Sequence, residues 1–175
     1  MTTPEGAENE PRPQLWAVDS SSLICVREKY SAAKEETVFE QLGVYATNGK
    51  MFFPPEVCGE LERGAESEAN PDAVLRWVLA HKRRCERVAT PENIRRVLAK
   101  VEELIDVDSP HEQADPYVLA VAVDLQIGGF HVCIITDDRR DKPKRLSLAT
   151  ASGIFMIPTV PLLGFMRGEG LLEPD

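Results

Sequence analysis

The sequence predicts an α/β fold, a three-layer α/β/α sandwich around a central, mostly parallel sheet of about four to five strands. Short apolar runs alternate along the chain with longer segments in which apolar residues recur at helical spacing. Parallel neighbours need a crossover of about a dozen residues or more, and the helical segments supply such crossovers. Acidic residues stand directly after two of the apolar runs, where open α/β folds place their ligand sites.

The apolar runs give the expected strands, and capping and stop signals give the expected helices. Ser20-Ser21-Ser22 can cap a helix, Pro91 suits a first helical turn, and Asn48-Gly49 is typical of a helix end. The expected strands are 15–18, 51–53, 132–136 and 154–157. Two expected helices are marked only by their start, one at Leu23 and one at Pro54-Pro55. The other expected helices are 35–45, 72–81, 91–105, 115–125, 146–151 and 160–166.

The chain has the length of one ordinary domain. Its 175 residues are enough for a proper core and too few for two comfortable ones. We expect a single domain over residues 14–175, preceded at 1–13 by a disordered acidic tail that contains proline and lacks periodicity. The role of an extended helical section at 65–108 is not indicated by the sequence.

Composition argues against several classes of protein. The formal net charge of -9 disfavours a protein that coats nucleic acid nonspecifically. No apolar stretch approaches the roughly 18 residues of a membrane span, and the acidic start is unlike a signal peptide. The four cysteines form no C-x-x-C pair, so we expect buried thiols in a reducing compartment. A soluble, cytoplasmic protein is expected.

The acids that follow two of the strands pose an electrostatic problem. Asp19 follows the first strand, and Asp137 and Asp138 follow the third. If these strands are neighbours, their carboxylates face each other, and two unit charges about 4 Å apart repel by roughly 4 kcal/mol at an effective dielectric near 20. A cation would offset this repulsion, so the pattern indicates a divalent metal site.

Each candidate acid also has a purely structural interpretation. Asp19 could cap the helix that it opens, and Asp115 precedes a proline, as at an ordinary capped helix start. Glu60 could be an exposed helix residue, although it borders the apolar stripe of its helix. Asp137 and Asp138 could open a turn into the charged loop that follows.

Four short motifs, taken in order, resemble those of the PIN domain family, which includes VapC-type toxin nucleases. The first is the D-x-S opening Val18-Asp19-Ser20-Ser21, and the last is the T-x-D Thr136-Asp137-Asp138. Between them stand Pro55-Glu56-Val57-Cys58-Gly59-Glu60-Leu61, around the family's helical Glu, and Ala114-Asp115-Pro116-Tyr117-Val118-Leu119-Ala120-Val121-Ala122, its Asp-led helix. The resemblance covers about residues 15–166 and implies a PIN-like sandwich.

The resemblance implies an endoribonuclease that depends on Mg²⁺ or Mn²⁺ and hydrolyses RNA phosphodiester bonds at an acidic cluster. Hard cations prefer carboxylate and water oxygens, so no histidine is needed. Ser21 and Thr136 would orient carboxylates through hydroxyl hydrogen bonds. The implied catalytic acids and metal ligands are Asp19, Glu60, Asp115 and Asp138, with Asp137 able to take the place of Asp138.

Two basic runs, 82–100 and 139–145, could bring RNA phosphates to an acidic site, which would otherwise repel them. Both could instead be solvated faces. The run after the last acid is the first candidate for RNA contact, ahead of Arg83, Arg84 and Arg87. Its basic residues are Arg139, Arg140, Lys142, Lys144 and Arg145. The resemblance also implies a small antitoxin protein and a homodimer as partners.

Three other functions fit parts of the pattern. A noncatalytic PIN-like binding or scaffold module would keep the fold without metal affinity. A phosphotransfer enzyme of the haloacid dehalogenase type also begins with a strand-end Asp, but its D-x-D-x-T motif is not matched by Ser21 and Leu23. A phosphoacceptor receiver domain would have an early acidic pair and a Lys after a late strand, and neither pattern is clear.

Overall fold

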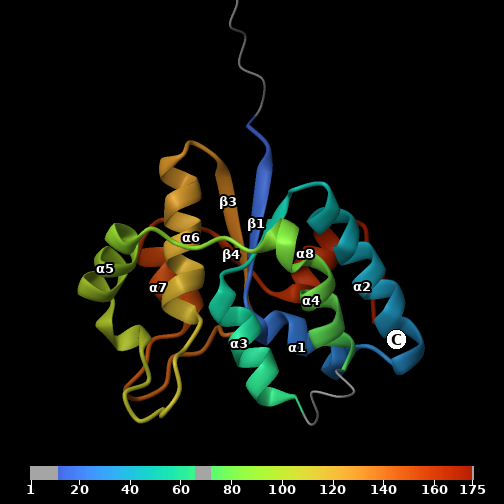
Figure 1. The fold of residues 1–175 in the computed structure, drawn as a ribbon, viewed down its shortest axis with the longest axis horizontal. Helices are drawn as coiled ribbons and strands as arrows, with labels where there is room; N and C mark the ends of the chain where they lie inside the picture. Colours follow the sequence, from blue (N-terminus) through green and yellow to red (C-terminus); the bar gives the residue numbers. More distant parts are fainter. Residues whose placement is uncertain (1–11, 66–71, 175) are drawn as a thin grey trace, which may run out of the picture.

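A four-stranded, all-parallel sheet forms the centre of the protein (Figure 1). The computed structural model describes residues 12–65 and 72–174. Each neighbouring pair of strands is parallel, which confirms the predicted α/β class and parallel sheet. The strands stand in the order β2-β1-β3-β4, with the bounds β1 Gln14–Val18, β2 Met51–Phe52, β3 His131–Ile135 and β4 Thr159–Val160.

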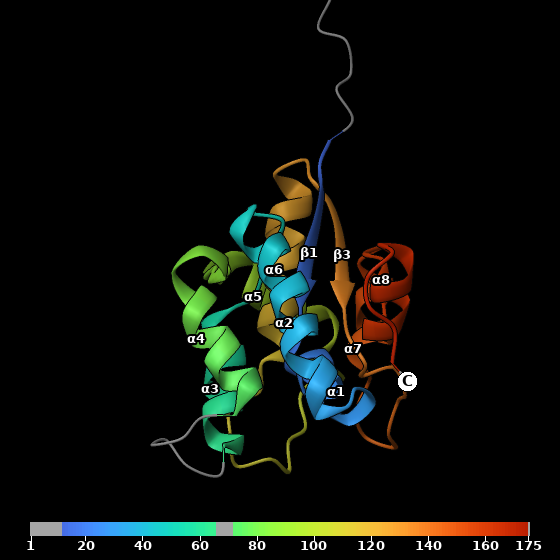
Figure 2. The ribbon, with the colours of Figure 1, turned by 90° about the vertical axis from the view of Figure 1, so that its right-hand side faces the viewer.

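Helices cover both faces of the sheet and complete the three layers. Figure 1 shows α5, α6 and α7 on one side of the strands and α1, α2 and α8 on the other, and in Figure 2 α1 and α2 lie in front of the strands. Helix α4 packs against α3 and the outer strand β2. The bounds are α1 Ser20–Lys29, α2 Ala32–Thr47, α3 Pro55–Gly64, α4 Ala73–Cys85, α5 Pro91–Lys100, α6 Asp115–Ile127, α7 Leu148–Ile154 and α8 Leu162–Gly168.

Helix α6 is the most enclosed element of the helical layers. Residues 118–123 are all buried, because the helix packs on β1 and β3 and is covered by α5 and α7. A helix enclosed on all sides is apolar around its whole circumference, as this one is. Its position is therefore fixed by packing, and so is Asp115 in its first turn.

The register between β1 and β3 brings their carboxyl ends level. Val18 stands opposite Ile135. The ladder continues one residue beyond β1, where the backbone N–H of Asp19 donates to the carbonyl of Ile135 at 3.0 Å. The next residue after β3, Thr136, donates its N–H to Val160 of β4 at 3.0 Å. The residues that follow both strands therefore meet at one edge of the sheet.

The expected fourth strand at 154–157 is wrong. Ile154 ends α7, and Met156 takes a positive φ of 56° that terminates the helix. The N–H of Met156 and that of Ile157 return to carbonyls of the last helical turn, which is a helix-end arrangement. The apolar run is used to close α7, and the strand forms two residues later at Thr159–Val160.

Several helix boundaries also differ from the prediction, among them the start of α1 and the end of α5. Helix α1 starts at Ser20, three residues before the expected start, so Asp19 is its N-cap residue. The expected helix at 91–105 ends at Lys100, where Val101 leaves helical geometry with φ −139° and ψ 57°, and a 3-10 turn follows at Glu102–Leu104. Val101 and Leu104 are both fully buried, so the apolar spacing persists although the helix does not.

Some expectations concern features at the margins of the fold. The four cysteines are all unpaired and buried, as expected. Within residues 12–65 and 72–174 no helix is both long and apolar enough to cross a membrane. Positions 1–11 of the expected tail lie outside the described residues. Positions 66–71 of the expected helical section at 65–108 also lie outside them.

Replacing Leu119 by alanine should lower the free energy of unfolding by about 2–5 kcal/mol, because it leaves a cavity at a fully buried point of α6. Urea unfolding monitored by circular dichroism measures this change. Ile127→Ala is the matched control, since Ile127 lies on the same helix and is 63% exposed. It should change the free energy of unfolding by no more than about 0.5 kcal/mol. Equal costs for the two variants would contradict this packing.

Candidate active site

A cavity of about 340 Å³ opens where the strands end, and acidic side chains line it, among them four from the segments that carry the sequence motifs. These four come from the residue after β1, the middle of α3, the first turn of α6 and the loop after β3. Ser21 and Arg145 also contribute to its wall. The lining carboxylates from these four segments are Asp19, Glu60, Asp115 and Asp138. The tertiary structure thus brings together the four acids that the sequence motifs indicate.

Asp19 is the most buried of these carboxylates, with 1% of the residue exposed. The hydroxyl of Ser21 and the hydroxyl of Thr136, the latter at 3.0 Å, both donate to its Oδ2 atom. Its side chain makes no capping hydrogen bond to α1, so the structural alternative of a helix cap does not account for it. Burial raises the pKa of Asp19 to about 6, and the hydrogen bond from Ser21 only partly offsets this increase.

Glu60 is held at both oxygens. The hydroxyl of Ser20 donates to Oε2, and the backbone N–H of Ala114 donates to Oε1 at 2.8 Å. Ala114 is the N-cap residue of α6, so the carboxylate lies at the positive end of that helix dipole. Glu60 is thereby bonded across the cavity to the first turn of another helix, unlike an ordinary exposed helix residue.

Asp115 pairs with an arginine inside the cavity. A terminal guanidinium nitrogen of Arg145 donates to Asp115 Oδ2. The same nitrogen also donates to Asp138 Oδ2, at 3.0 Å. Burial, reinforced by the neighbouring charge of Asp19, raises the pKa of Asp115 to about 8, although Arg145 acts in the opposite direction. Burial alone would lower the pKa of Arg145, but the charges of Asp115 and Asp138 outweigh it and raise that pKa.

The structure distinguishes between the two consecutive acids after β3. Asp138 lines the cavity, and its Oδ2 atom also accepts the N–H of Leu148 at 2.9 Å, in the first turn of α7. Asp137 does not line it. Its carboxylate accepts a hydrogen bond from the hydroxyl of Ser22 at 2.7 Å and another from the N–H of Leu162 at 3.1 Å. Leu162 is the first residue of α8. Asp137 therefore caps a helix, and the proposed substitution of Asp137 for Asp138 in the cluster is not supported by this geometry.

Four residues of the cavity wall, Ile24 of α1 and three from one loop, were not indicated by any sequence motif. Asp106, Ser109 and Gln113 come from the loop between the 3-10 turn and α6. The side-chain amide of Gln113 bonds both the N–H and the carbonyl of Asp106, each at 2.8 Å, and so ties the two ends of this loop together. The sequence shows a polar segment just before the Asp-led helix, but this segment has no periodicity or motif spacing that would assign its residues to the site.

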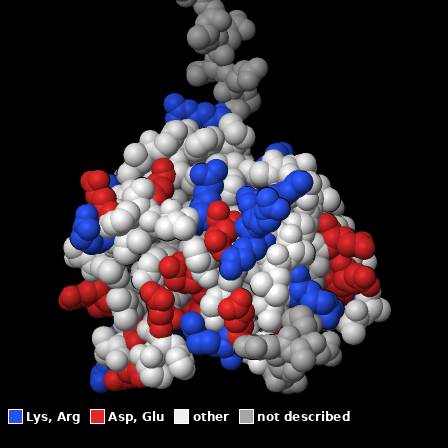
Figure 3. Space-filling view, in the orientation of Figure 1, with Lys and Arg blue, Asp and Glu red and all other residues white. Residues whose placement is uncertain are grey.

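The basic loop after the last acid divides into exposed and inward-facing side chains. Arg139, Arg140, Lys142 and Lys144 are exposed, as a surface for RNA phosphates requires. Arg145 instead enters the acidic cavity, where it pairs with Asp115 and Asp138, and its contact with RNA stays a prediction. Figure 3 shows a band of basic side chains beside acidic ones on one face of the molecule, so the negative net charge is unevenly spread.

The donor chemistry of the cavity fits a hard divalent ion, but its present arrangement does not provide a ready-made site. Carboxylate oxygens are the ligands that Mg²⁺ and Mn²⁺ prefer. Within the described residues, however, no three His, Cys, Asp or Glu side chains are grouped so that they could hold a metal ion. The guanidinium of Arg145 also already binds Asp115 and Asp138. An ion could use both acids only after the guanidinium moved.

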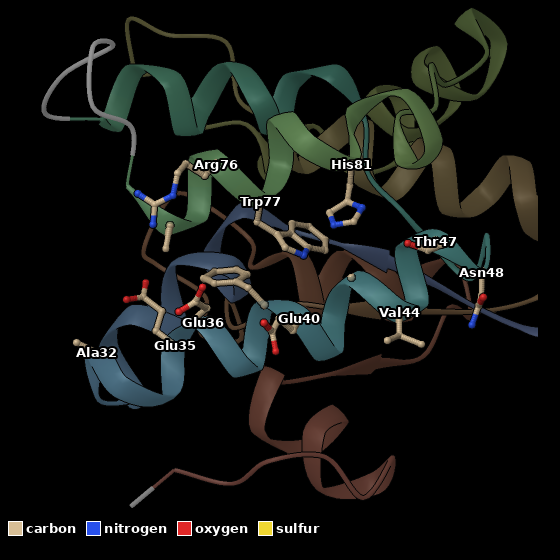
Figure 4. A pocket seen from close by; sticks show the side chains of 13 residues that line it. Ala32, Glu35, Glu36, Glu40, Val44, Thr47, Asn48, Arg76, Trp77 and His81 are labelled. Atoms are coloured by element: carbon tan, nitrogen blue, oxygen red, sulfur yellow. The ribbon is translucent and has the colours of Figure 1, made fainter.

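A wider groove lies away from this chemistry, between α2 and α4 (Figure 4). It has a volume of about 750 Å³, and the rings of Phe39 and Trp77 form part of its wall. The imidazole of His81 lies beside the Trp77 indole, with ring centroids 4.9 Å apart. No sequence-predicted site residue lines this groove, so the candidate site is the smaller cavity at the sheet edge.

Metal-free protein should become more stable as the pH falls from about 8 to 5. The raised pKa means that folded protein holds a proton on Asp115 up to about pH 8, whereas unfolded chain releases it near the model-peptide value of 3.8. Thermal unfolding in EDTA at several pH values measures the trend. Because the net charge of -9 adds a similar trend, Asp115→Asn is the control and should show a smaller rise. Identical pH dependence in both proteins would contradict the raised pKa.

The comparison with known proteins identifies a family but no function. A search of curated proteins found no significant match. A family model described as "Domain of unknown function" (DUF4411) matches residues 16–172, a stretch that contains every residue lining the cavity. The match covers far more than half of the chain, and the protein therefore belongs to the DUF4411 family.

Proposed function

We propose that this protein is a cytoplasmic endoribonuclease of the PIN type, which hydrolyses RNA phosphodiester bonds with the help of Mg²⁺ or Mn²⁺. One observation carries the proposal: carboxylates from four separated segments converge on one cavity at the carboxyl edge of a parallel sheet. The motif order in the sequence singles out the same acids without reference to the fold. These are Asp19, Glu60, Asp115 and Asp138.

The chain supports this chemistry by holding the carboxylates in fixed positions. The hydroxyls of Ser21 and Thr136 hold Asp19, and backbone N–H groups at helix starts hold Glu60 and Asp138. A bound divalent ion would lower the pKa of an attacking water and polarise a phosphate oxygen. No nucleophilic side chain is needed, because water attacks the phosphorus. The role of the protein is then to position the acids and the RNA backbone.

The basic loop is placed to bring that backbone to the acids. The loop leaves the cavity at Asp138 and returns to it at Arg145, so we expect its exposed side chains to lie near the cavity. Cationic groups there would offset the repulsion between a polyanion and a cluster of carboxylates. The exposed members are Arg139, Arg140, Lys142 and Lys144.

The proposed biological role comes from the sequence resemblance to the PIN domain family. Action as the toxin of a toxin–antitoxin pair, with a small restraining protein and a homodimeric state, rests on the sequence resemblance alone. A noncatalytic PIN-like binding module is the second candidate. The occupation of the acidic cluster by Arg145 favours this candidate, because the carboxylates are already partly neutralised without a metal.

Purified protein should cleave tRNA or mRNA with Mg²⁺ or Mn²⁺ and should not do so with EDTA. Glu60→Gln, or Asp19→Asn combined with Asp115→Asn, should reduce the cleavage rate at least about 100-fold, because even outer partners of metal ligands are worth about 10–100-fold. Glu62→Gln is the matched control, since Glu62 lies on the same helix and is exposed. Absence of metal-dependent cleavage, or full activity in the acid variants, would favour the noncatalytic module.

Replacing Lys142 and Lys144 by alanine should weaken RNA binding and reduce its dependence on salt. Each lost phosphate contact lowers the slope of log affinity against log salt by about 0.7 for single-stranded RNA. Fluorescence anisotropy with a labelled RNA and the inactive Asp115→Asn protein measures the slope. Lys50→Ala, at an exposed position just before β2 and so at the opposite edge of the sheet, should leave it unchanged. An unchanged slope in the double lysine variant would exclude these side chains as phosphate contacts.

A further inference from the structure

The guanidinium of Arg145 is the only cationic group that lines the acidic cavity in the described part of the chain. Only 17% of the Arg145 side chain is exposed, and Asp115 and Asp138, its two partners, are 10% and 18% exposed. The same terminal nitrogen contacts the Oδ2 atoms of both acids. A side chain from the surface loop therefore bridges two carboxylates that come from different elements of the fold.

The backbone fixes the point from which this side chain enters the cavity. Arg145 and Lys142 exchange two backbone hydrogen bonds, of 2.8 and 3.1 Å. The next residue, Leu146, donates its N–H to the carbonyl of Glu103 at 2.8 Å. The loop is thus closed on itself and attached to the neighbouring 3-10 turn. The inward course of Arg145 is consequently part of the fold and does not depend on a single surface contact.

The side chain itself is held less completely than its backbone. Its Nε atom is buried and has no hydrogen-bond partner among the described residues. The ion pairs with Asp115 and Asp138 both use one terminal nitrogen. Release of that nitrogen would break only these two pairs, and the cavity in front of it provides space for the guanidinium to move.

We propose that Arg145 is a built-in counter-ion of the acidic cluster, and that its guanidinium and a divalent cation exclude each other at Asp115 and Asp138. This inference rests on the proposed metal-dependent function. Both cations would need the carboxylates of Asp115 and Asp138, and like charges in a poorly solvated cavity repel strongly. Without metal, Arg145 partly neutralises the cluster. When metal binds, its guanidinium is released at the rim, beside the exposed basic side chains that would meet an RNA phosphate.

Isothermal titration of the RNA-free protein with Mn²⁺ tests this exclusion. Arg145→Gln should bind Mn²⁺ at least about tenfold more tightly than the wild type, because the competitor is gone. Arg139→Gln is the matched control: it removes one positive charge from the same loop, but Arg139 bonds Thr159 and not the cavity acids. It should change the affinity less than about twofold. An affinity of Arg145→Gln equal to that of Arg139→Gln would overturn the proposal.

A second measurement uses the wild-type protein and does not depend on the folding of a variant. In a spectrum of protein labelled with ¹⁵N-arginine, the side-chain signal of Arg145, assigned by its loss in Arg145→Lys, should shift as Mg²⁺ is added. The signal of Arg139 should stay in place. A signal of Arg145 that is unaffected when Mg²⁺ saturates the protein would show that guanidinium and metal do not compete.

The outcomes separate this inference from the proposed function. If neither wild type nor Arg145→Gln binds Mn²⁺, both the inference and the metal-dependent nuclease are overturned. Tighter binding in Arg145→Gln without RNA cleavage by the wild type supports the counter-ion role and removes the nuclease. Metal-dependent cleavage with unchanged Mn²⁺ affinity in Arg145→Gln supports the nuclease and overturns the counter-ion role.

Discussion

The parallel pairing of β1 with β3 is the constraint on which the rest of the structure depends. It sets Val18 opposite Ile135, so the chain leaves both strands at the same edge of the sheet and Asp19 lies within hydrogen-bonding distance of Thr136. Parallel strands require long crossovers, and the crossover before β3 ends in α6. Helix α6 packs on both strands and thereby places Asp115 at the same edge.

The concentration of negative charge at that edge is the second constraint. Four carboxylates around one cavity would repel one another, and the fold offsets this repulsion by several means. Hydroxyl donors hold Asp19, the start of α6 holds Glu60, and the start of α7 holds Asp138. Arg145 supplies a full positive charge. Burial is the main cause of the raised pKa values of Asp19 and Asp115, and the charges of neighbouring acids add to the increase.

Local sequence patterns predicted the elements whose boundaries are set by local chemistry. Helix α6 was predictable because a proline opens it and Gly128-Gly129 closes it, and β1 because it is short and fully apolar. The expected strand at 154–157 failed because periodicity does not distinguish an apolar strand from an apolar helix end. There the left-handed turn at Met156 ends α7, and the strand forms only after it.

The sequence by itself determined the fold class and the four acids that share the cavity, because strand-end and helix-start positions are local properties that a parallel sheet carries to one edge. Only the tertiary structure decided between Asp137 and Asp138. The two are consecutive, and the starts of α8 and α7 hold them in different places. The inward course of Arg145 was likewise decided by tertiary contacts, since the backbone of its loop is hydrogen-bonded to the 3-10 turn at Glu102–Leu104, which is far away in the sequence. No local sequence pattern indicates which basic residue of the run 139–145 enters the acidic cavity.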